Sequence, residues 1–117
     1  MSYDLLFWKQ PEGYKATPSE IYQLLTSQQT PDALEDLPIA AINEALRMAF
    51  PQFDPEEGGF DTPEGFIDCY FERKYFSAMV YGTGASSDRL TEILAEHGCP
   101  LYDPQEDKRY PLGQHPR

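Results

Sequence analysis

The sequence has few basic residues and no long apolar run, and both scarcities exclude classes of partner. Nine lysines and arginines stand against twenty aspartates and glutamates, which gives a net charge of -11 over 117 residues. A surface with this much negative charge repels phosphate backbones and anionic headgroups. We therefore expect neither nucleic acid nor membrane as a partner. No segment approaches the roughly 20 apolar residues of a membrane span, and no secretion signal opens the chain. We therefore expect a cytoplasmic protein.

Cysteine and histidine are equally scarce, with two of each. Cys69 and Cys99 are too few for a disulfide framework, and neither has a histidine at a spacing typical of a nucleophile. His97 falls at the end of a predicted helix and His115 in a predicted tail, which does not suit a zinc site. We expect no metal, no cofactor and no catalytic residue. The sequence favours a non-enzyme.

The acidic residues that are present concentrate in the middle of the chain. Residues 1–16 are neutral and residues 73–117 carry six charges of each sign, whereas residues 54–72 carry seven acids and no base. Such a stretch is often a solvated loop that keeps a protein soluble. Because this one leads into an aromatic strand, the alternative is a binding face for a basic partner.

Hydrophobic spacing and capping residues predict the elements of the first half. The aromatic-aliphatic run at 3–8 indicates a strand, and the sequence TPSE at 17–20 is typical of a capped helix start. That helix is expected to end near residue 27. Asp36 is a plausible cap for a second helix, which Pro51 ends, and residues 51–65 are expected to be an acidic loop.

The second half reads as a hairpin, a helix and then either a terminal strand or a small hairpin. Strands are predicted at 66–71 and 75–81, and Ser86 or Ser87 is expected to cap a helix that stops before Gly98. Short strands around 101–110 and a tail at 111–117 complete one domain, residues 1–117. Counting the early helices as one crossover gives a β-α-β-β-α-β order. The expected fold is α+β and ferredoxin-like, an antiparallel sheet with its helices on one face.

Alternation along the hairpin separates two faces of the sheet. One face is apolar and belongs beneath the helices: Ile67, Cys69, Phe71, Phe76, Ala78 and Val80. The other mixes rings with carboxylates: Phe66, Asp68, Tyr70, Glu72, Tyr75, Ser77, Met79 and Tyr81. In the first strand, either Leu6 with Trp8 or Leu5 with Phe7 must also face outward.

An open sheet face of aromatic residues among charges has the composition of a protein interface. Its aromatic rings also suggest an RNA-stacking platform, but such a platform needs basic residues around it. A dimer mate or the C-terminal tail covering the face is the plainer alternative. The predicted partner-binding residues are Trp8, Asp54, Glu56, Glu57, Asp61, Asp68, Tyr70, Glu72, Tyr75 and Tyr81.

Three segments carry a resemblance to a known group of proteins: MSYDLLFWK at 1–9, TPSEIY at 17–22 and CPLYDPQ at 99–105. With them the chain resembles small acidic bacterial immunity proteins of contact-dependent, Rhs-type or type VI-delivered toxin systems. The resemblance implies a protein, monomer or homodimer, that binds and neutralises one cognate toxin domain, and it carries over no site residue. The alternatives are a homo-oligomeric or adaptor domain and, more remotely, a small ferredoxin-like enzyme that uses carboxylates such as Asp68.

Overall fold

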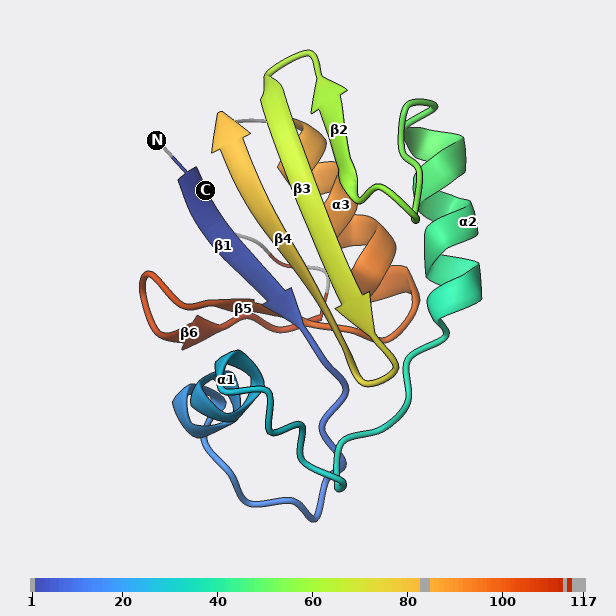
Figure 1. Ribbon diagram of the computed structural model, residues 1–117. Coiled ribbons are helices and arrows are strands. Elements are labelled where there is room, and N and C mark those ends of the chain that lie inside the picture. The colour runs from blue at the N-terminus through green and yellow to red at the C-terminus, as the bar shows by residue number, and fades with distance from the viewer. Residues whose placement is uncertain (1, 83–84, 113, 115–117) are drawn as a thin grey trace.

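Among the described residues, six strands form one antiparallel sheet in the order β2-β3-β4-β1-β5-β6, accompanied by three helices (Figure 1). The computed structural model describes residues 2–82, 85–112 and 114. The predicted α+β class is confirmed. The elements are β1 (Ser2–Phe7), α1 (Pro18–Thr26), α2 (Ile39–Ala49), β2 (Gly59–Thr62), β3 (Gly65–Glu72), β4 (Tyr75–Gly82), α3 (Ala85–Glu96), β5 (Leu101–Asp103) and β6 (Lys108–Arg109).

The predicted hairpin is the longest strand pair of the sheet, running from the Gly65–Gly82 pair to the Glu72–Tyr75 pair. Its open end requires glycine on both strands. Gly65 has φ +154° and Gly82 has φ +114°, and a Cβ at either would collide with a carbonyl oxygen of the opposite backbone. The two glycines thus let β3 and β4 stay paired to their ends.

The apolar face of the hairpin lies against α2 and α3, as predicted. Ile67, Cys69, Phe76, Ala78 and Val80 are all buried there, with Phe71 packed at the margin. The two helices contribute the stripes expected from their spacing to the same core: Ile42 and Leu46 from α2, and Leu90, Ile93 and Leu94 from α3. Leu5 and Phe7 of β1 join this core, so Leu6 and Trp8 face the other way.

Helix α1 packs on the opposite face of the sheet, so the prediction that all helices share one face is wrong. Ile21 and Leu25 of α1 are buried in a second cluster with Leu6, Trp8 and Tyr102. Figure 1 shows α3 behind the strands and α1 apart from it, near the end of β1. The reason is the sequence of β1, which is apolar on both faces and needs a cover on each.

The ends of α1 and α2 show one capping prediction confirmed and one wrong. The Thr17 side chain accepts from the Glu20 N–H and the Glu20 carboxylate accepts from the Thr17 N–H, which is the predicted capping box. Pro38, without a side-chain cap, precedes α2. Asp36 instead pairs with Arg73 at 3.2 Å, beside the turn between β3 and β4.

Helix α3 begins earlier than predicted, so Ser86 and Ser87 are buried in its first turn rather than capping it. The Ser86 N–H donates to the Glu64 carboxylate at 3.0 Å, and this acid therefore satisfies one of the free N–H groups of the helix start. At the other end Gly98 adopts φ +83°, the left-handed conformation predicted for it.

The segment 51–65, predicted as loop, contains strand β2 and the first residue of β3. Phe60 of β2 is buried in the core against Phe50 and Phe53, and this anchor holds the short strand in place. Of the two alternatives predicted near the C-terminus, the small hairpin is present as β5 and β6. Of the predicted tail, Pro111, Leu112 and Gln114 are exposed, whereas residue 113 and residues 115–117, including His115, lie outside the described residues.

None of the helices in the described part of the chain has both the length and the apolar character needed to cross a membrane.

The two faces of the hairpin make a testable pair at adjacent positions. Val80→Asp is expected to unfold the protein, because an unpaired carboxylate in the core costs several kcal/mol against a total stability of about 5–15 kcal/mol. Tyr81→Asp, the same change on the exposed side, should leave a cooperative thermal transition close to that of the wild type. Equal damage in both melting curves would show that the two faces are wrongly assigned.

Candidate functional site

The face of the sheet that α1 leaves uncovered carries large exposed side chains. Tyr70 is 55% exposed, Tyr81 is 42% exposed, and Phe66 and Met79 are each 38% exposed. All four alternate with buried residues of β3 and β4, so their outward position follows from the strand period. Phe66 and Tyr81 are cross-strand partners with ring centroids 6.1 Å apart. We refer to this surface, with the acids described next, as the open face.

Four carboxylates share the open face with these rings. Register places Asp61 of β2 opposite Phe66, and it places Asp4 and Asp68 on either side of Met79 across three neighbouring strands. Glu72 accepts a hydrogen bond from the Tyr70 hydroxyl. No lysine or arginine lies among the outward residues of β1 to β4, and in the described part of the chain none of the four forms an ion pair.

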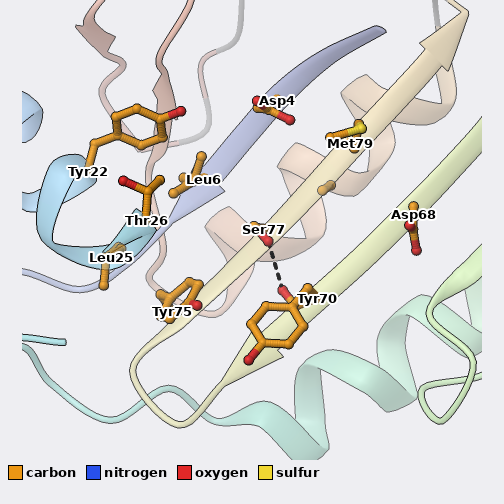
Figure 2. Close-up of a pocket in the computed structure, with 11 residues that line it drawn as sticks. Asp4, Leu6, Tyr22, Leu25, Thr26, Asp68, Tyr70, Tyr75, Ser77 and Met79 are labelled. Atoms are coloured by element: carbon orange, nitrogen blue, oxygen red, sulfur yellow. Dashed lines mark hydrogen bonds between the residues drawn. The ribbon is translucent and has the colours of Figure 1, made fainter. Parts of the chain in front are cut away.

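A cavity of about 270 Å³ lies where the open face meets α1 (Figure 2). Tyr22, Leu25 and Thr26 of α1 form one side, and Figure 2 shows Leu6 of β1 beside them. Tyr70, Tyr75, Ser77 and Met79 line the sheet side, with Asp4 and Asp68 on separate strands at its margin. Ser77 donates a hydrogen bond to the backbone carbonyl of Tyr70 at 3.2 Å, within the β3–β4 pair.

Three tyrosines around the cavity have raised pKa values, caused by burial and by nearby carboxylates. Burial, and then the charge of Glu72, raise the pKa of Tyr75 to about 12. Burial and the nearby Asp4 raise the pKa of Tyr22, and the hydrogen bond to Glu72 raises that of Tyr70. All three are therefore neutral phenols at neutral pH.

Most of the predicted binding residues are exposed, but they divide into two groups. Asp61, Asp68, Tyr70, Glu72 and Tyr81 lie together on the open face. The loop acids are exposed but precede β2, whose first residue pairs with Asp68, so they border the open face rather than lie on it: Asp54, Glu56 and Glu57. The loop is ordered locally by the Asp54 carboxylate, which accepts from the Glu56 N–H at 3.0 Å.

Two predicted anchors are not exposed, because α1 covers them. Trp8 is 0% exposed, with the guanidinium carbon of Arg109 4.2 Å from its ring centre and Tyr102 packed against it. Tyr75 is 8% exposed and forms an inner wall of the cavity rather than a free anchor. Both side chains do leave the sheet on the predicted side, but a helix covers that part of the face.

The site residues that the sequence analysis missed are Asp4 and the three α1 residues at the cavity. Alternation places Asp4 on the same face of β1 as Leu6, but the sequence did not show which face of β1 points away from α2 and α3. No sequence signal indicated that α1 crosses to this side.

Both cysteines are free and buried. Burial raises the pKa of Cys69 to about 12, with a further contribution from Asp68, and burial raises that of Cys99 to about 11. Both thiols are therefore protonated at neutral pH. Within residues 2–82 and 85–112, no group of three histidine, cysteine or acidic side chains is arranged to hold a metal ion. His97 is tied by its ring nitrogen Nδ1 to the Ile93 carbonyl at 2.8 Å, a local contact at the end of α3.

Comparisons of the chain with protein-family models, with curated proteins and with solved structures gave no match.

Proposed function

We propose that this protein is a non-catalytic cytoplasmic inhibitor of the immunity type, which binds and neutralises one cognate bacterial toxin domain. The observation that carries the proposal is the open face, where exposed Phe66, Tyr70 and Tyr81 stand among four acids and no base. Amphipathic aromatic residues are the usual anchors of protein interfaces. The resemblance of three segments to immunity proteins names the class of partner.

The charge of the chain favours a basic toxin domain, such as a nuclease. A net charge of -11 speeds the approach of a positive partner and competes with a phosphate backbone for the same surface. Charge alone does not hold a complex, because exposed charges are screened by salt and remain hydrated. The aromatic residues of the open face supply the desolvated contacts that slow dissociation.

We also propose that the core of the fold is ferredoxin-like. Taken alone, strands β3-β4-β1-β5 have the neighbour order of a ferredoxin-like sheet, and α2 and α3 occupy the positions of its two crossover helices. In this interpretation β2 and β6 are additions at the edges, and α1 is an extra helix that covers part of the face left open in the simple arrangement.

The direct test is protection in cells. Co-expressed with the toxin domain encoded beside it, the wild-type protein should restore growth and co-purify with that domain. Tyr70→Ala combined with Tyr81→Ala should abolish protection, since nanomolar affinity, about 12 kcal/mol, depends on a few buried anchors. Met48→Ala combined with Leu112→Ala removes two exposed side chains away from the open face and should leave protection intact.

Thermal melts accompany this test, and both double variants should melt close to the wild type because all four side chains are exposed. A wild-type protein that neither protects nor binds would contradict the immunity proposal. If size-exclusion chromatography then showed a homodimer that Tyr70→Ala with Tyr81→Ala dissociates, the open face would belong to the oligomeric adaptor.

The salt dependence of the association rate tests whether the acidic residues steer the partner electrostatically. With a basic partner, the association rate should fall steeply between low and physiological salt, because the Debye length shrinks to roughly 8–10 Å. Converting Asp54, Glu56, Glu57 and Asp61 to their amides should slow association more than it changes dissociation, measured by stopped flow. The matched control removes four exposed acids away from the open face: Glu12, Glu35, Glu44 and Glu96. If the association rate did not depend on salt, or fell equally in both variants, these four acids would not steer the partner.

A further inference from the structure

The cavity between α1 and the sheet has a shape and lining suited to a single long side chain. It holds about 270 Å³, far less than a folded element needs, and it opens beside the exposed ring of Tyr70. Leu6 and Leu25 give it an aliphatic wall, while Tyr22, Tyr70 and Tyr75 surround it with rings (Figure 2). These walls favour an occupant that has an apolar stem.

The charges of the cavity are all of one sign. Asp4 and Asp68 belong to its lining, and no lysine, arginine or histidine does. Neither carboxylate forms an ion pair in the described part of the chain. The negative field already acts on the cavity's own phenols, since Asp4 contributes to the raised pKa of Tyr22. Charge complementarity therefore requires a cation as the occupant.

The arrangement favours an organic cation over a metal ion. Asp4 and Asp68 are on strands separated by β4, so their Cα atoms are about 10 Å apart, and a metal ion needs several oxygen ligands within roughly 2.5 Å. The other oxygens of the lining are neutral hydroxyls, from Thr26, Ser77 and the tyrosines, and it contains no third carboxylate. A guanidinium is planar, weakly hydrated and rich in donors, and it stacks on aromatic rings better than an ammonium does.

We propose that this cavity receives an arginine side chain of the toxin partner. Its stem packs on Leu6 and Leu25, its guanidinium stacks on the tyrosine rings, and its N–H groups donate to Asp4 and Asp68. The identity of the partner rests on the proposed function, but the chemistry of the cavity does not. An arginine held in this way would both anchor the complex through its buried stem and pair with the carboxylates through its charge. On the rest of the open face, these two contributions come from different residues, the rings and the acids.

The probe is N-acetyl-L-arginine amide, titrated into the full-length protein and followed by two-dimensional amide NMR. Binding in the millimolar range should shift the amide signals of residues 4–6, 22–26, 68–70 and 75–79 and few others. N-acetyl-L-lysine amide should bind several-fold more weakly, and the neutral N-acetyl-L-norleucine amide should cause no localised shifts. Localised shifts with norleucine amide, or none with arginine amide, would overturn the proposal.

The matched variants change the charge equally at two places. Asp4→Asn with Asp68→Asn should weaken arginine amide about tenfold or more, because two charge-assisted hydrogen bonds are lost. Glu12→Gln with Glu35→Gln, two exposed acids outside the cavity and the open face, should leave the affinity unchanged. Equal weakening in both would show attraction to net charge alone and overturn the proposal.

A variant of Thr26 tests the same cavity without changing Asp4 or Asp68. Thr26 is exposed at the end of α1 and lines the cavity, so Thr26→Arg supplies a guanidinium in place and should block the probe, whereas Thr26→Ala should not. Unimpaired probe binding by Thr26→Arg would contradict the assigned location.

The outcome with the toxin domain is separate from the outcome with the probe. Probe binding without toxin binding would leave the cation site standing and remove the immunity proposal. Toxin binding that Asp4→Asn with Asp68→Asn leaves unchanged would keep the immunity proposal and exclude the cavity from the interface.

Discussion

Burial of β1 on both of its faces is the constraint on which the rest of the structure depends. Leu5 and Phe7 enter the core beneath α2 and α3, while Leu6 and Trp8 enter the cluster beneath α1. A strand that is apolar on both sides is stable only if each side is covered. Because α1 provides the second cover only at one end of β1, the open face is limited to the uncovered part of β1, β2, β3 and β4, and the cavity forms at the boundary.

The same boundary explains why rings and carboxylates coexist on this face. Trp8 and Tyr75 lie under the helix and are buried, whereas Tyr70 and Tyr81 are not covered by it and stay exposed. Carboxylates beside exposed rings cost little in water, since both oxygens stay hydrated. In a complex that excludes water the same carboxylates need positive partners, so the face discriminates against neutral and acidic surfaces. A basic partner is the one for which both contributions are favourable.

Local patterns predicted much of the fold because the responsible interactions are local. The capping box at Thr17, the left-handed Gly98 and the alternation along β3 and β4 each depend on near neighbours in the chain. The misassigned features depend on tertiary packing instead. The side that α1 covers, the burial of Trp8 and the strand β2 anchored by Phe60 follow from which apolar surfaces remain unmatched after the sheet forms. Asp4 was missed for the same reason, since its face was undetermined until α1 was placed.

The rigidity of the open face bears on how an inhibitor of this size reaches high affinity. Its anchors project from the paired strands β3 and β4 rather than from loops, and the glycine pair at the hairpin's open end keeps these strands in register. Side chains held on such a frame lose little conformational freedom on binding, so more of the contact energy remains as affinity. The Tyr70–Glu72 hydrogen bond restricts one anchor further before any partner arrives. In the proposed complex, this preorganised acidic and aromatic surface would inhibit the toxin domain by occupying a basic site on it.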